Sequence, residues 1–164
     1  MNIFQLTLSL SIIFCSLVAG FLFAFAIVVM PGIKQLTDGE YIRAFQVMDG
    51  IIQKNQPVFM LVWIGSIIII LAASVLGIGQ LDSLSRFLLI AATLIYLVGV
   101  QVPTGMMNIP LNNQLQALDA NNLADSELHK ARENFEAPWN KSNTIRTFFA
   151  VLTSVLLVIV LLRI

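Results

Sequence analysis

The chain has 164 residues, of which 58% are hydrophobic and only 11% are charged, and its formal net charge is zero. Because a soluble domain carries about 25% charged residues, this composition predicts an integral membrane protein. The balanced charge gives no electrostatic reason to bind nucleic acid. The single cysteine, Cys15, excludes an internal disulfide and lies in an apolar segment, where a packing role is expected.

Four segments approach the ~20 apolar residues that a helix needs to cross a bilayer. The pattern therefore predicts an all-α fold, a polytopic membrane four-helix bundle that forms one domain over residues 1–164. The first segment lacks a basic amino-terminal region and a small-residue cleavage site, so it is interpreted as a membrane helix rather than a signal peptide. The four segments are residues 3–30, 57–76, 87–107 and 147–162.

Two polar insertions, residues 37–55 and 110–137, are predicted to form amphipathic helices on one side of the membrane and to cover one end of the bundle. Thr37 and Glu40 have the spacing of a capping box, which predicts the start of the first insertion helix. Asp49 lies close to the apolar face of that helix. There its carboxylate either needs a cationic partner or reaches water at the boundary.

Prolines predict where the helices end or bend. Pro31 is expected to end the first membrane helix, and Pro103 is expected to kink the third. In the second insertion, Pro138 is expected to break a helix that starts near Asp125, just before Trp139. Both halves of the chain share the order of membrane helix, proline, insertion and membrane helix, so a parallel duplication is an open alternative.

The basic residues gather on the side of the insertions. By the positive-inside rule, this distribution favours insertions in the cytoplasm and both termini outside. Seven of the nine Lys and Arg residues lie there, namely Lys34, Arg43, Lys54, Lys130, Arg132, Lys141 and Arg146.

Polar side chains are expected to meet at one membrane level. Amides and a guanidinium suit a flat, oxygen-bearing small molecule, because they offer donors and acceptors for a carbonyl or an oxyanion. The alternative is that the asparagines cap helices and that Arg146 extends to the membrane interface. Asp49 is expected to pair with Arg146, because neither charge is stable there without a partner. The candidate residues are Asp49, Asn108, Asn112, Asn113, Trp139, Asn140, Asn143 and Arg146.

A metal centre is not expected. His129 and Cys15 are the only residues of their types, and neither has the spacing of a zinc or iron site. Four methionines at about one depth raise copper as an alternative, but methionines there are more often pocket lining. No phosphate loop, haem-attachment motif or serine-nucleophile motif is present, so no cofactor is predicted.

Three motifs together resemble the anthrone oxygenase-like membrane family. The resemblance implies a four-helix membrane fold, and fungal relatives include cofactor-free oxygenases that convert a polyketide anthrone to an anthraquinone. Because most members are bacterial, it also implies the inner membrane of a bacterial cell. It further implies Asp49 as the base, His129 as the second candidate base, and Arg146 with the asparagines as the groups that stabilise an oxyanion. The motifs are Gly20-Phe21-x-Phe23-Ala24 to Met30-Pro31-Gly32, Asn108-x-Pro110-Leu111-Asn112 and Trp139-Asn140-x-x-Asn143-x-x-Arg146-Thr147.

Two functions are carried forward. The first is a cofactor-independent oxygenase or related enzyme that acts on an aromatic or phenolic small molecule at the membrane. The second is a non-catalytic membrane protein that binds a small molecule or lipid in the same pocket. A transporter subunit is disfavoured, because few polar groups lie near the middle of the second and third membrane helices. The expected partners are membrane lipid and a small hydrophobic or aromatic ligand, and self-association into a homo-oligomer is left open.

Overall fold

The computed structural model describes residues 2–164, which form helices joined by short turns and contain no strand. Four helical stretches are long and apolar enough to cross a membrane, so the predicted all-α bundle is confirmed and the chain is a multi-pass membrane protein. In chain order the helices are α1 (Ile3–Ala24), η1 (Phe25–Val29), α2 (Met30–Ile33), α3 (Asp38–Gln53), α4 (Pro57–Gly77), α5 (Ser83–Tyr96), η2 (Leu97–Gln101), η3 (Thr104–Asn108), α6 (Ile109–Gln116) and α7 (Asp125–Leu162).

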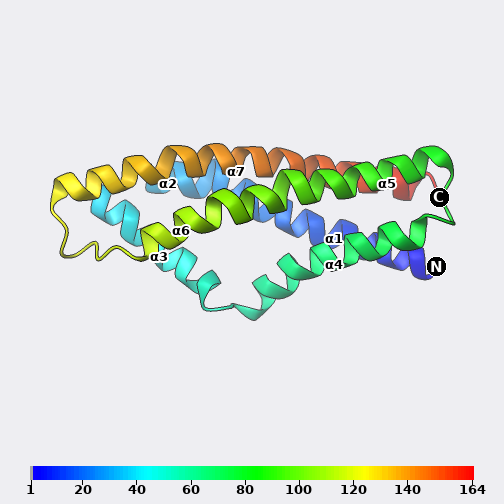
Figure 1. The fold of residues 1–164 in the computed structure, drawn as a ribbon, viewed down its shortest axis with the longest axis horizontal. Coiled ribbons are helices and arrows are strands. Elements are labelled where there is room, and N and C mark those ends of the chain that lie inside the picture. The colour runs from blue at the N-terminus through cyan, green and yellow to red at the C-terminus, as the bar shows by residue number, and fades with distance from the viewer. Residues whose placement is uncertain (1) are drawn as a thin grey trace.

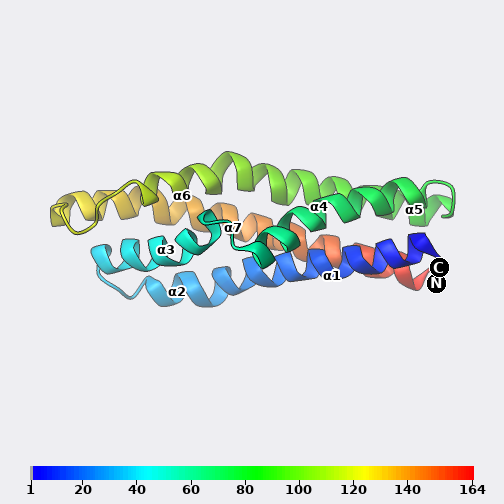
Figure 2. The same cartoon turned by 90° about the horizontal axis from the view of Figure 1, so that it is seen from below.

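Three of the four rows of the bundle are continuous helices, and the fourth is built from two helices placed end to end. After α2, helix α3 runs back beside α7, and α4 continues in the same direction to the end where both termini lie (Figures 1 and 2). Residues 54–56 join them, and Asn55 there has a φ of 57°, a left-handed conformation that asparagine tolerates. We call residues 54–56 the α3–α4 break.

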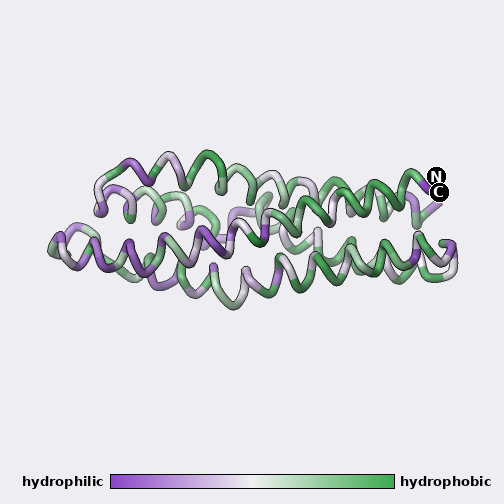
Figure 3. Tube along the Cα trace, turned by 90° about the horizontal axis from the view of Figure 1, so that it is seen from above, coloured by the Kyte–Doolittle hydropathy of each residue, from purple (hydrophilic) through white to green (hydrophobic). Residues whose placement is uncertain are grey.

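The bundle has an apolar half and a polar half. The half that carries both termini is hydrophobic along all of its helices, whereas the other half is rich in hydrophilic residues (Figure 3). Both insertions therefore lie at the end opposite the termini. The capping box of Thr37 and Glu40 is confirmed at the start of α3, where the Glu40 carboxylate accepts from both the Thr37 backbone N–H and hydroxyl.

Three predicted helix boundaries are wrong: those at Pro31, at Pro138 and at the end of the third membrane helix. Helix α7 runs without interruption through Pro138, which lies inside it. The neighbours Phe135 and Trp139 are both buried in the apolar cluster with α3, so packing holds the helix together although proline removes one backbone hydrogen bond. The third membrane helix also continues into α6, and the second insertion is therefore an extension of two long helices rather than a separate cap.

A π-helical turn precedes three of the prolines and explains why they do not end their helices. The turns η1, η2 and η3 lie just before Pro31, Pro103 and Pro110, respectively. A proline ring collides with the carbonyl one turn earlier in an α-helix, and a wider turn moves that carbonyl away. The first membrane helix accordingly continues past Pro31 to Ile33 rather than ending at the proline.

Close packing in the apolar half leads to a first prediction. A Cβ atom added at Gly99 would lie 2.5 Å from the ring of Phe149 on α7, whereas one added at Gly105 would meet nothing within 4 Å. Gly99→Ala is expected to lower the free energy of unfolding by about 1 to 3 kcal/mol, as overpacking does. Gly105→Ala is the matched control and should be neutral or stabilising. Thermal unfolding of both variants in one detergent tests this, and equal midpoints would contradict it.

Candidate functional site

A cavity of about 210 Å³ lies where α3 ends and α4 begins, and we call it the α3–α4 cavity. Its residues on α7 directly precede the apolar run of residues 147–162, so it lies at the edge of the apolar half. Apolar and aromatic side chains form most of its wall: Phe21, Leu22, Phe25, Ile52, Phe59, Met60, Trp63, Ile109 and Trp139. The polar lining consists of Asp49, Thr104, Asn108, Asn112, Asn143 and Arg146.

Asp49 faces this cavity from the last turns of α3, and only 4% of the residue is exposed. One carboxylate oxygen, Oδ1, accepts from Asn112 Nδ2 at 2.7 Å. The other, Oδ2, accepts from Gln53 Nε2 at 2.8 Å and Gln116 Nε2 at 3.0 Å. Three neutral amides therefore hold the carboxylate in place, and no cation does. Hydrogen bonds from several donors suit a charged carboxylate.

Arg146 faces the same cavity from α7 and is also 4% exposed. Its Nη1 donates to Thr104 Oγ1 at 3.1 Å, and its Nη2 donates to Asn143 Oδ1 at 2.9 Å. Its Nε is buried and has no hydrogen-bond partner among the described residues. The guanidinium carbon lies 5.7 Å from the centre of the Trp139 ring. Nη1 and Nη2 thus each make one hydrogen bond, and Nε makes none.

The predicted ion pair between Asp49 and Arg146 is wrong. Each charge is held by neutral hydrogen-bonding groups of its own, and the two side chains form no salt bridge although they line one cavity. The physical reason is that a buried charge needs hydrogen bonds but does not need an opposite charge, if amides and hydroxyls are placed around it. The charges remain available to a third molecule.

The asparagines of the cavity are committed to other protein groups. Asn112 Oδ1 accepts from the Trp139 indole N–H at 2.8 Å, and Asn143 Nδ2 donates to the backbone carbonyl of Leu22 at 3.1 Å. Asn108 Oδ1 accepts from the Ser142 hydroxyl at 2.6 Å. These amides therefore position the charged residues and join the helices. This agrees in part with the alternative that the asparagines have a structural role.

Most of the candidate residues line the α3–α4 cavity, but two of them do not. Asn113 and Asn140 lie outside the lining of the α3–α4 cavity, although Asn113 accepts a hydrogen bond from Gln53. The structure adds Thr104, which binds Arg146, and Gln116, which binds Asp49. Thr104 could have been found, because it lies one turn before Asn108 on the same helical face. Gln116 depends on how α3 and α6 pack, which no local pattern reveals.

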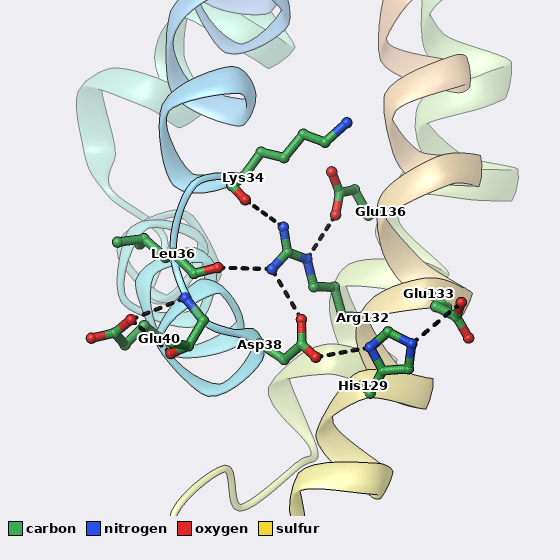
Figure 4. A network of polar contacts seen from close by, with 9 residues as sticks. Lys34, Leu36, Asp38, Glu40, His129, Arg132, Glu133 and Glu136 are labelled. Carbon is green, nitrogen blue, oxygen red and sulfur yellow. Dashed lines mark hydrogen bonds and ion pairs between the residues drawn. The ribbon is translucent and has the colours of Figure 1, made fainter.

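His129, the second candidate base, lies in another polar cluster, far from the cavity lining. In Figure 4, Arg132 points from α7 toward the segment between α2 and α3, where it donates to the carbonyls of Lys34 and Leu36. Arg132 also pairs with Asp38 at 3.0 Å, and its guanidinium lies over the Tyr41 ring. This cluster fastens the turn between α2 and α3 to α7.

The same cluster predicts a pH dependence of stability. His129 Nδ1 lies 2.9 Å from Asp38 Oδ2, and this contact raises the pKa of His129 above its ordinary value of 6.5 and lowers that of Asp38. Glu133, near His129 Nε2, also raises the histidine pKa, and Arg132 opposes it. A raised histidine pKa stabilises the fold below the unfolded-state pKa, and the stabilisation is lost as pH rises through the folded-state pKa.

The thermal midpoint of the protein in detergent should therefore fall as pH rises from slightly acidic to mildly basic values. Since His129 is exposed and Asp38 is only partly buried, the change should be small. His129→Gln should flatten this part of the profile without changing the unfolding midpoint at high pH. An unchanged slope in the variant would assign the pH dependence to other groups.

Within residues 2–164, no group of three or more His, Cys, Asp and Glu side chains is placed to hold a metal ion. The cavity instead combines an aromatic wall with one carboxylate and one guanidinium. Fold and site together define a four-helix, multi-pass membrane protein with a mainly apolar cavity at the edge of its apolar half, whose wall also includes one carboxylate and one guanidinium group.

The sequence model of the family described as anthrone oxygenase matches residues 57–156, which is more than half of the chain. The chain belongs to the anthrone oxygenase family, as the motifs of the sequence suggested. The matched part holds α4 to α6 and most of α7, including Thr104, Asn108, Asn112 and Arg146. No curated protein and no solved structure matches the chain.

Proposed function

We propose that this protein is a membrane-embedded oxygenase that needs no cofactor and oxidises an aromatic or phenolic small molecule in the α3–α4 cavity. The observation that carries the proposal is the pair of unpaired buried charges. Asp49 and Arg146 face one aromatic-walled cavity without neutralising each other. Burying two charges that do not neutralise each other is unfavourable for folding alone, and a role in function explains why the protein keeps them.

In this proposal Asp49 takes a proton from the bound substrate. The negative charge spreads over the aromatic system and reaches a ring oxygen near Arg146, whose guanidinium charge stabilises it. The electron-rich carbanion then reduces O₂ and combines with it to form a hydroperoxide. Loss of water leaves a carbonyl, so a CH₂ group and O₂ become C=O and H₂O. The substrate supplies all four electrons, which is why no cofactor is required.

Membership of a family described as anthrone oxygenase supports this chemistry. The test is oxygen uptake by the purified protein in detergent, with a phenolic anthrone as the substrate. Uptake above that of the substrate alone, and insensitive to metal chelators, supports the proposal. As a control, the Asn140→Ala variant should keep the oxygen uptake of the wild type, because Asn140 lies outside the α3–α4 cavity. No uptake with any phenolic substrate would overturn it.

The second candidate is a non-catalytic protein that binds a small molecule or lipid. The observation that favours it is the mainly apolar wall of the cavity at the edge of the membrane half. Two measurements together distinguish the enzyme from the binding protein: mass spectrometry of the purified protein and oxygen uptake. A ligand that stays bound and consumes no oxygen would favour binding alone.

A further inference from the structure

A second cavity lies between the end of the first membrane helix and α7, and we call it the α2–α7 cavity. Its volume is about 300 Å³, and its wall comes from η1 and α2 on one side and from α7 on the other. Asn140, which lies outside the α3–α4 cavity, lines this one. Asn143 lines both cavities and separates them. The proposed oxidation uses none of the polar groups that are found in the α2–α7 cavity alone.

The lining of this cavity carries one charge, that of Lys34, and includes no acidic residue. In the part of the chain that the structure describes, the Lys34 ammonium group has no hydrogen-bond or ion-pair partner. Glu136, one turn before Asn140 on α7, does not line the cavity, and its carboxylate is paired with Arg132 at 2.8 Å. The α2–α7 cavity is therefore positively charged and suits an anion.

Lys34 is held beside α7 through its backbone. Its carbonyl oxygen accepts from Arg132 Nη2 at 2.7 Å, and the carbonyl oxygen of Leu36 accepts from Arg132 Nη1 at 2.9 Å. Figure 4 shows the Lys34 side chain extending from the end of α2 toward α7. The lysine backbone is thus fixed at the cavity before a ligand binds, which reduces the entropy that binding would otherwise cost.

The side-chain amide of Asn140 adds neutral donors to the lysine. It is half-buried and makes no hydrogen bond within residues 2–164, although the Asn140 backbone carbonyl accepts from the Thr144 hydroxyl at 3.0 Å. Asn143 already uses both its amide nitrogen and its amide oxygen in contacts with protein groups. The free donors are therefore the ammonium of Lys34 and the amide N–H groups of Asn140. Several donors around one point match the oxygens of a phosphate.

The cavity lies where the apolar half of the bundle begins. It extends along the first membrane helix from Ala26 to Lys34, and eight residues of helix correspond to a rise of about 12 Å. Ala26 belongs to the apolar run of that helix, whereas Lys34 lies at its polar end. Beside the cavity, Val28 on η1 and Phe148 on α7 are 64% and 63% exposed. Acyl chains of the membrane cover such side chains, so a phosphate in this cavity lies at the level of the lipid headgroups.

We propose that the α2–α7 cavity binds the headgroup of an anionic phospholipid. Lys34 and Asn140 donate to the phosphate oxygens, and the acyl chains lie against the exposed apolar side chains of η1 and α7. A cavity of about 150 Å³ holds one benzene ring, and the larger volume here admits a phosphate with its glycerol. A phosphate ester in solution shares the headgroup chemistry but lacks the chains. This site is independent of the proposed oxygenase activity.

The experiment is native mass spectrometry of the delipidated full-length protein in detergent. The probes are dioleoylphosphatidylglycerol, dioleoylphosphatidylcholine, which has the same chains and phosphate but no net charge, and dioleoylglycerol, which has no phosphate. The first molecule of phosphatidylglycerol should bind about fivefold more tightly than phosphatidylcholine, the effect expected of one lysine near an anionic lipid. Dioleoylglycerol should bind most weakly. Equal affinity for the two phospholipids would overturn the proposal, and this comparison needs no variant.

Two lysine variants locate the site. Lys34→Gln should abolish the preference for phosphatidylglycerol, and it should fold, because the Lys34 side chain is exposed and its backbone carbonyl still binds Arg132. Lys141→Gln is the matched control. Lys141 is exposed next to Asn140 on α7 and lines a different groove, so the variant loses the same charge at the same membrane level. It should retain the preference, and equal losses in both variants would assign the attraction to surface charge in general and overturn the site.

A further comparison identifies the source of the phosphate. Glycerol 1-phosphate carries the anion without the chains, and phosphatidylglycerol should bind at least about tenfold more tightly, because its chains are buried against the protein. Equal affinity would assign the cavity to a soluble phosphate and overturn the lipid. Oxygen uptake by Lys34→Gln should equal that of the wild type, because Lys34 does not line the α3–α4 cavity.

Discussion

Replacing Asp49 by asparagine is expected to lower the rate of substrate oxidation by about 10²- to 10⁴-fold, the range that a general base contributes. Asparagine has nearly the same shape and can keep hydrogen bonds to Gln53 and Gln116, but it cannot take up a proton. The loss should appear in kcat, with a smaller change in KM. Initial rates of oxygen uptake over a range of substrate concentrations measure both.

Two controls make this result specific. His129→Gln should retain full activity, because His129 belongs to the cluster around Arg132 and not to the cavity. The folded fraction of Asp49→Asn is checked by its thermal midpoint, which should lie close to that of the wild type. A wild-type kcat in Asp49→Asn would show that Asp49 is not the base. Loss of activity in His129→Gln would indicate His129 as the base instead.

The missing ion pair also changes the expected coupling between the two charges. A direct pair predicts that a double variant loses less stability than the two single variants added together. Since Asp49 and Arg146 have separate partners, the losses of Asp49→Asn and Arg146→Gln should be additive within about 0.5 kcal/mol.

The sequence was sufficient to predict the membrane bundle and most of the polar residues that line the α3–α4 cavity, because these depend on local patterns. Hydropathy over 20 residues identifies membrane helices, and the spacing of Trp139, Asn143 and Arg146 at i, i+4 and i+7 places them on one face of α7, all lining the cavity. What could not be predicted depends on packing between distant segments. Two of the three amides that hold Asp49, those of Asn112 and Gln116, come from α6, which packs against α3 only in the folded bundle.

The prolines also show that local sequence rules alone do not predict where the helices end. Local rules place a break at Pro138, yet the adjacent aromatic residues keep α7 continuous by packing against α3. At Pro31, Pro103 and Pro110 the helix continues after a π-helical turn. The helices are therefore longer than the proline positions predict. The end of α3 and the start of α4 both lie beside the cavity.

Trp139→Ala is expected to cause the largest loss of stability, about 3 to 5 kcal/mol, as is usual when a buried aromatic side chain is removed. Trp139 is 4% exposed and lies 5.4 Å from the Phe45 ring, 5.8 Å from Phe25 and 6.1 Å from Phe135, measured between ring centres. It therefore joins α3, η1 and α7 beside the cavity. The substitution also leaves Asn112 Oδ1 without its indole donor, which adds to the loss.

Trp139→Phe separates the two contributions. Phenylalanine retains most of the aromatic packing and loses only the indole N–H, so its loss should be about 1 to 3 kcal/mol. Denaturant unfolding of the three proteins in one detergent, followed by circular dichroism because one of the two tryptophans is removed, gives the free energies. Since Asn112 also holds Asp49, both variants should oxidise the phenolic substrate more slowly than the wild type. If Trp139→Ala unfolded at the same denaturant concentration as Trp139→Phe, the aromatic cluster would not be what holds α3 against α7, and the cavity would depend on the polar contacts alone.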